Sequence, residues 1–212
     1  MICSQCQGIE NFFDRREAER RLRRYRKSGP SKSTRILIDA IREHSADGTT
    51  LLDIGGGIGA VQHELLEAGV AEAICVEAST AYIDAASEEA ARQGHGDRVT
   101  FHRGDFVDMA ASLQPVHIVA LDRVICCYHD VGRLVGLSSG LATEVYGLVY
   151  PRGNWAFKVA FRFFNFMLWL RRSPFRIFIH PDSVIDAVVR SNGLQRRFYR
   201  KTLLWQIVVY GL

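Results

Sequence analysis

The stretch LLDIGGGIGA, residues 51–60, decides the fold, because an apolar run ends there in an acidic residue and four glycines. Glycine weakens regular structure, but it tolerates positive φ and lets backbone pass close to a ligand. The next residues, AVQHELLEAG, have a helical pattern that ends near Gly69. A strand, a glycine-rich turn and a helix present backbone N–H groups to a bound group. The sequence therefore predicts a ligand site in this turn.

The alternation of strand and helix continues toward the C-terminus. Apolar runs at AEAICVEAS, RVTFHRGD, VHIVALDRV and EVYGLVYPRG predict four more strands, and helical patterns lie at 80–94 and 180–193. Strands separated by helices indicate a parallel sheet. LQRRFYRK and LLWQIVVYGL follow with only a short break, which predicts an antiparallel hairpin. We expect an α/β fold with a seven-stranded, mostly parallel sheet.

Composition is that of a globular protein rather than a disordered or fibrous one. Of the 212 residues, 48% are hydrophobic and 24% are charged, with a mild net charge of +4. The start, MICSQCQGIENFFDRR, lacks the pattern of a secretory signal, and no apolar run is long enough to span a membrane. Five cysteines, an odd number, favour reduced thiols. We therefore expect a cytoplasmic protein.

The glycine turn fits two known patterns. Gly55, Gly57 and Ala60 match the G-x-G-x-x-A fingerprint of dinucleotide sites, which is a weak signal alone. Asp53, Gly55, Gly57 and Gly59 match D-x-G-x-G-x-G. An acid at the strand end repels a pyrophosphate but suits a ligand that carries an ammonium or a sulfonium group.

LLDIGGGIG resembles the first motif of class I S-adenosylmethionine-dependent methyltransferases, and the later motifs follow in order from about residue 35. The resemblance implies that Glu77, followed by Ala78, binds the ribose hydroxyls of S-adenosylmethionine. It implies that Asp105 lies near the adenine amino group and Phe106 by the ring. Asp122 and Arg123 would then end the fourth strand beside the transferring methyl group. The resemblance also implies a Rossmann-like sheet with a reversed last strand.

The acceptor is less defined by the sequence. DRVI after the fourth strand lacks the Pro-Pro motif of amino-directed nucleic acid methyltransferases, and Cys126 does not follow the proline usual in cytosine-C5 enzymes. The layout is similar to magnesium-protoporphyrin O-methyltransferases, which share an FFDR-like start, a stretch like TRILIDAI and a late HP. This likeness implies a small-molecule acceptor and an N-terminal helical cap.

Candidate catalytic groups lie in DRVICCYHD. Methyl transfer requires an in-line arrangement and removal of any acceptor proton. His129 is a candidate general base, Tyr128 a candidate for lining the donor or orienting the acceptor, and Arg123 a candidate anchor for an acidic group. Alternatively, His129 caps a helix or faces solvent, and Arg123 forms a structural ion pair. The CSQC at Cys3 and Cys6 is half a zinc site that Cys126 and Cys127 would have to complete, and we expect no metal.

Two segments lie outside the core pattern. We assign residues 1–34 to an N-terminal helical cap and 35–212 to the methyltransferase domain, with an aromatic helical insert at 154–172. We expect the insert to be a lid over an apolar acceptor. A packing helix at a homodimer contact and a peripheral membrane helix are the alternatives. The basic stretch DRREAERRLRRYRKSG is either a solvated helix or an RNA-binding one, and RNA is the weaker interpretation because interleaved aromatics are missing. A small acidic substrate or an anionic membrane surface would use the same charge.

These observations predict S-adenosylmethionine-dependent methyl transfer to an oxygen or nitrogen of an apolar or aromatic small molecule. An RNA or protein methyltransferase is one alternative. A partner subunit that binds S-adenosylmethionine without catalysis is another.

Overall fold

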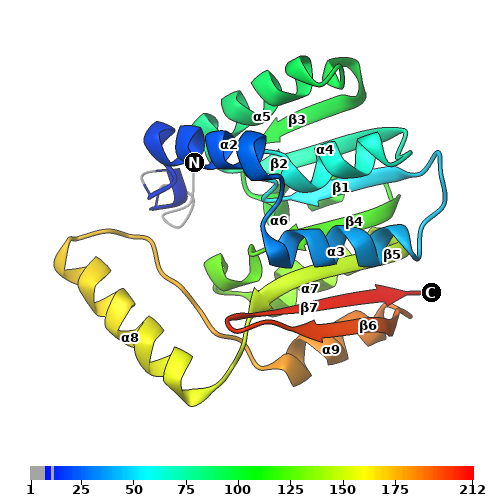
Figure 1. Ribbon diagram of the computed structural model, residues 1–212. Coiled ribbons are helices and arrows are strands. Elements are labelled where there is room, and N and C mark those ends of the chain that lie inside the picture. Colours follow the sequence, from blue (N-terminus) through cyan, green and yellow to red (C-terminus); the bar gives the residue numbers. More distant parts are fainter. Residues whose placement is uncertain (1–7, 11) are drawn as a thin grey trace.

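A single seven-stranded sheet organises the molecule. The computed structural model describes residues 8–10 and 12–212. The sheet order is β3-β2-β1-β4-β5-β7-β6, and β7 alone runs opposite to the other strands (Figure 1). The expected fold class is confirmed. The strands are β1 Thr50–Ile54, β2 Glu72–Glu77, β3 Val99–Arg103, β4 Val116–Asp122, β5 Ala142–Pro151, β6 Gln195–Lys201 and β7 Trp205–Gly211.

Helices cover both faces of this sheet. α3 (Lys32–Arg42) and α4 (Ala60–Glu67) pack on one face, and α5 (Thr80–Arg92) lies along β2 and β3. α6 (Phe106–Met109), α7 (Val131–Gly140) and α9 (Asp182–Ser191) pack on the other. Short 3-10 turns occupy Gly96–Arg98, Ala110–Ser112 and Ile125–Cys127.

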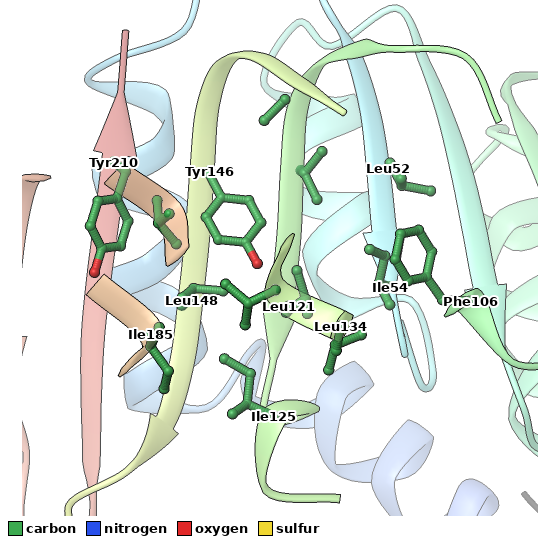
Figure 2. Packing of buried hydrophobic residues seen from close by; sticks show 14 of the residues in the cluster. Leu52, Ile54, Phe106, Leu121, Ile125, Leu134, Tyr146, Leu148, Ile185 and Tyr210 are labelled. Carbon is green, nitrogen blue, oxygen red and sulfur yellow. The ribbon is translucent and has the colours of Figure 1, made fainter. Parts of the chain in front are cut away.

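The alternation of side chains along β1 supplies both halves of the core. Leu51 packs with α3 and α4, whereas its neighbour Leu52 points to the opposite cluster. Figure 2 shows that second cluster, in which Leu121 and Tyr146 from the sheet meet Leu134 of α7. Both faces of the central strands are therefore buried, as parallel strands require.

The N-terminal segment folds over the carboxyl end of the sheet. α2 (Arg15–Ser28) buries Ala18, Leu22 and Tyr25 against Ile58 and Tyr82. Just before it, the Phe13 carbonyl accepts a hydrogen bond from the Ser79 hydroxyl at 2.8 Å. We call residues 12–28 the N-terminal cap. The boundary expected between residues 34 and 35 falls inside α3, whose apolar face belongs to the core of the sheet.

The insert forms α8 (Trp155–Leu170), which projects away from the sheet (Figure 1). Leu168 is its only buried residue. The Asn165 side chain exchanges two hydrogen bonds with the backbone of Ile177, at 2.7 and 2.9 Å, and so holds the returning chain. Among the described residues, no helix is long and apolar enough to cross a membrane.

Candidate functional site

The acidic residues singled out in the sequence meet at one edge of the sheet. Glu77 and Asp122 end β2 and β4, Asp53 is the last residue but one of β1, and Asp105 follows β3. Because parallel strands present their carboxyl ends at the same edge, all four line one cavity of about 650 Å³. This volume is in the range of small-molecule sites.

The glycine turn brings backbone up to this cavity. Gly55 has φ 63° and donates its N–H to the Val76 carbonyl at 2.7 Å, and an added Cβ would lie 2.5 Å from Val124 Cγ2. Gly57, at φ 60°, donates its N–H to Glu77 Oε2 at 3.0 Å. Both glycines line the cavity. A side chain at either position would strain the backbone, and one at Gly55 would also collide with Val124.

Gly59 allows the backbone to turn into α4 and does not line the cavity. It has φ 81°, precedes the first residue of α4, and an added Cβ would lie 2.6 Å from His63 Nε2. It is not among the described residues that line the cavity.

Asp53 is a fully buried carboxyl group, and no cationic side chain pairs with it in the described part of the chain. Burial, with the nearby Asp122 and Glu77 charges, raises the pKa of Asp53 to about 8. A buried unpaired carboxylate is costly unless a cation approaches it. The geometry therefore fits a ligand whose ammonium or sulfonium group lies close to Asp53.

Glu77 connects two loops. Its Oε2 accepts from the Gly57 N–H and its Oε1 accepts from the Ser79 N–H at 2.9 Å. Burial raises the pKa of Glu77, and the backbone hydrogen bonds oppose that rise. Together with the adjacent Ala78 it lines the cavity. A carboxylate here offers its remaining lone pairs to a diol.

Asp105 and Tyr128 close the next side of the cavity. Asp105 Oδ1 accepts from the Val107 N–H at 3.0 Å, and its Oδ2 accepts from the Tyr128 hydroxyl at 3.1 Å. Phe106 is buried beside them and also lines the cavity. The residues expected at an adenine ring therefore lie on the same wall as Tyr128.

Arg123 joins the loop after β4 to the start of α3. It adopts φ 65°, which is unusual for a non-glycine residue. Its guanidinium donates to the hydroxyls of Ser31, Ser33 and Thr34 and lies 5.2 Å from the Trp205 ring centroid. The Nε of Arg123 lies 3.3 Å from Asp122 Oδ1, and Asp122 Oδ2 accepts a hydrogen bond from the Thr34 hydroxyl at 2.6 Å. Both side chains line the cavity.

The two histidines near β4 differ in position. His129 is exposed, stacks on Tyr128 at 5.3 Å between ring centroids, and is outside the described cavity lining. His180, from the HP motif, is half-buried, and its Nε2 lies 2.8 Å from the Tyr128 carbonyl oxygen. Burial lowers the pKa of His180. Its contact positions the Tyr128 backbone, which the sequence alone did not reveal.

The two thiols at the cavity lie in contact with each other and form no disulfide. Cys126 and Cys127 both line it, with sulfur atoms 3.8 Å apart. The hydrogen bond to Cys126 and burial raise the pKa of Cys127, which keeps this thiol protonated. Within residues 8–10 and 12–212, no three His, Cys, Asp or Glu side chains gather in a way that would hold a metal. Cys3 and Cys6 lie outside the described residues.

The sequence did not predict which residues form the cavity wall opposite the strand ends. The N-terminal cap contributes Phe13, Glu17, Arg20, Arg21 and Arg24. The remaining apolar part comes from Phe175, Ile177 and Trp205. The helical spacing of Ala18, Leu22 and Tyr25 is the signal that one face of α2 packs on the protein. Among the lining residues described, none comes from α8, so the insert does not cover the cavity here.

Part of the chain matches a known family model. Residues 51–138 match the family model described as a methyltransferase domain. No match was found among curated proteins.

Solved structures share the fold at low sequence identity. Magnesium protoporphyrin IX methyltransferase from Synechocystis, with bound S-adenosylhomocysteine, gives a TM-score of 0.73 at 16% identity, covering 98% of this chain and 99% of that one. An O-methyltransferase family protein from Burkholderia thailandensis gives 0.66 at 18% identity, covering 84% of this chain and 55% of that one. This chain thus spans little more than half of the second protein. A putative RNA methyltransferase from Pyrococcus horikoshii gives 0.59 at 14% identity, covering 87% and 83%.

Proposed function

We infer that this chain, which carries a class I S-adenosylmethionine-dependent methyltransferase domain, methylates an oxygen or nitrogen of an apolar or aromatic small molecule. The observation that carries this proposal is the composition of the cavity. Carboxylates at the strand ends form one side, and Phe13, Phe175, Ile177 and Trp205 contribute apolar surface beyond them. Such a cavity offers polar groups to one ligand and apolar contacts to a second.

The residues at the strand ends fit the donor, which supplies an electrophilic methyl group on a sulfonium. Asp53 and the turn at Gly55 and Gly57 would hold its amino acid portion. Glu77 would accept from the ribose hydroxyls, and Asp105 with Phe106 would bind the adenine. The burial of Asp53 without a cation beside it supports this orientation, because the ammonium group would stabilise its ionised form.

The remaining chemistry is alignment of the acceptor. The protein has to hold the acceptor atom in line with the methyl group and exclude water. Asp122, Arg123 and Tyr128 line that part of the cavity. We propose Tyr128 as the group that orients the acceptor and Arg123 as the residue that fixes the loop behind it. For His129 to act as a base, its exposed ring would have to turn toward the cavity.

Calorimetric titration with S-adenosylhomocysteine, with NADH as the control, tests the donor site. We expect micromolar binding of the former only. The acceptor is then sought by transfer of a labelled methyl group into the organic-soluble, RNA and protein fractions of a cell extract. Label in the organic-soluble fraction supports the proposal, and label that ribonuclease or protease removes contradicts it.

An RNA acceptor is the second candidate, since the cap exposes many arginines. Several are already paired: Glu17 binds Arg20 and Arg21, and Glu19 binds Arg15 at 3.0 Å. This internal neutralisation weakens the electrostatic case for RNA. Donor binding without label in any fraction would favour the non-catalytic alternative. The reduced thiols of Cys75 and Cys126 support a reducing compartment, and we propose the cytoplasm.

A further inference from the structure

The helix α8 presents a wide apolar face to the outside of the molecule. Its inner face is formed by Phe157, Phe161, Asn165 and Leu168, which are buried or half-buried and recur at helical spacing. The opposite face carries Trp155, Val159, Phe163, Phe166 and Leu170, all exposed. Trp155 is 78% and Phe163 66% exposed. Single exposed apolar residues are ordinary, but a contiguous stripe of this kind marks an interaction surface.

Cations border this apolar face. Lys158 and Arg162 lie one turn apart beside it, and Trp169 lies along the same border. Arg171 and Arg172 follow directly after the helix and are exposed. From residue 145 to residue 181 the sequence holds six cations, Arg152, Lys158, Arg162, Arg171, Arg172 and Arg176, and no acidic residue. A surface that complements this helix therefore has an apolar interior and a negatively charged outer layer.

We propose that α8 is an interfacial helix that docks this protein onto an anionic lipid surface. The helix has 16 residues and rises about 24 Å, short of the ~30 Å hydrocarbon layer, so it lies on the membrane and does not span it. Aromatic and aliphatic side chains enter the headgroup boundary, while lysine and arginine bind lipid phosphates. A second copy of the chain fits less well, because two such helices face to face would bring their cations together.

α8 lies next to the apolar wall of the cavity. Phe164, on the side of α8 toward the body, contacts Phe12 at 6.3 Å between ring centroids, and Phe12 stacks on Phe175 at 4.5 Å. Phe12 and Phe175 both line the cavity. A membrane-bound α8 therefore holds the apolar wall of the cavity beside the lipid, where apolar acceptors accumulate. This consequence rests on the proposed function, but the docking itself does not.

Flotation of the full-length protein with lipid vesicles tests the proposal. We expect it to float with phosphatidylglycerol vesicles and not with phosphatidylcholine vesicles, and to be released by high salt. Tryptophan fluorescence should shift to the blue on binding, because Trp155 and Trp169 are two of the three tryptophans. No flotation with phosphatidylglycerol, or equal flotation with phosphatidylcholine, overturns the proposal.

Variants locate the contact on α8. Trp155→Ser with Phe163→Ser should weaken binding by about tenfold or more for each aromatic removed. Lys158→Glu with Arg162→Glu should weaken it by more than about 25-fold. The control is Leu137→Ser, an apolar residue 38% exposed on α7. Unchanged S-adenosylhomocysteine binding shows that each variant is folded.

If the aromatic variant is unfolded, the charge-reversal variant and the salt dependence decide the question. Variants that bind vesicles like the original chain overturn the proposal. It is also overturned if sedimentation shows a dimer that the Trp155→Ser, Phe163→Ser variant loses, because α8 would then be covered by a second copy.

Discussion

Glu77 holds together the two loops that surround the donor site. Its oxygens accept from the N–H groups of Gly57 and Ser79. Glu77→Ala should lower affinity for S-adenosylhomocysteine by at least about tenfold, because charge-assisted hydrogen bonds contribute about 1.5–3 kcal/mol. Calorimetry measures this loss. The affinity of Glu77→Gln, which retains an acceptor, should lie between those of the original chain and of Glu77→Ala.

The control for Glu77 lies on the same strand. Glu72→Ala removes an exposed carboxylate at the opposite end of β2 and should leave affinity unchanged. Equal affinity of the Glu77→Ala and Glu72→Ala variants would contradict the assignment of Glu77 to the donor.

Asp53 couples donor binding to a proton. Burial raises its pKa to about 8, so the group is mainly protonated at neutral pH in the free protein. A nearby ammonium favours the ionised form, so binding should release protons and affinity should rise with pH up to about 8. Calorimetry at pH 7 in two buffers of different ionisation enthalpy counts the protons. Asp53→Asn should abolish the release, and release that persists in that variant would assign it to another group.

Like Asp53, His63 is a buried titratable group. It lies on α4 and packs between α2 and α5. It is fully buried, and its ring lies 6.4 Å from that of Tyr25. Burial, aided by the neighbouring His95, lowers the pKa of His63 to about 4. Because the unfolded chain binds this proton near pH 6.5, stability is fully present above pH 6.5 and is lost as pH falls to 4, by about 3 kcal/mol.

Urea unfolding across this pH range measures that loss. His63→Gln should flatten the curve, whereas His129→Gln, at an exposed ring, should leave it steep. A curve that stays equally steep in the His63 variant would assign the pH dependence to other groups.

α8 is fixed to the returning chain by one amide. Asn165→Leu removes both hydrogen bonds to Ile177, whereas Asn165→Asp keeps the acceptor for the Ile177 N–H and loses the donor. We expect faster tryptic cleavage at Arg171 and Arg172, most in the leucine variant, with little change in global stability. Cleavage at the original rate in both variants would show that apolar packing alone holds α8.

The sheet was predictable because its pattern is local. Apolar runs that end in Asp53, Glu77 and Asp122 identify strands that are buried on both faces. α7 was not predicted: VGRLVGLSSG contains three glycines within ten residues, which masks its helical signal, although Leu134 and Val135 bury it firmly. Tertiary packing overrides propensity there.

The donor side of the site followed from motifs, but its opposite wall did not. Motif residues lie at strand ends, whose relative positions follow from the sheet order. The contacts of Arg123 with Ser31 and Thr34 span about ninety residues of chain and depend on how α3 packs, which no local pattern encodes. The position of His129 outside the cavity lining depends likewise on where α7 begins, because Asp130, the next residue, caps that helix.

The cavity joins parts of the chain that are otherwise separate, so its ligand should stabilise them together. Lining residues come from the N-terminal cap, the ends of four strands and the segment after α8. S-adenosylhomocysteine at about a hundred times its Kd should stabilise the protein by about 2.7 kcal/mol and raise Tm by about 5–10 °C. Calorimetric melting measures this shift, and Glu77→Ala at the same concentration should show little of it.

The distribution of that stabilisation distinguishes a closed site from an open one. Phe13, Glu17 and Arg21 face the same cavity as Asp53 and Glu77. Ligand should therefore slow hydrogen exchange in the cap, residues 12–28, as well as in the loops at 53–59 and 77–79, since opening the cap would expose the bound ligand to water. Protection confined to the two loops would mean that the cap moves independently of the donor and that its arginines act only when an acceptor binds.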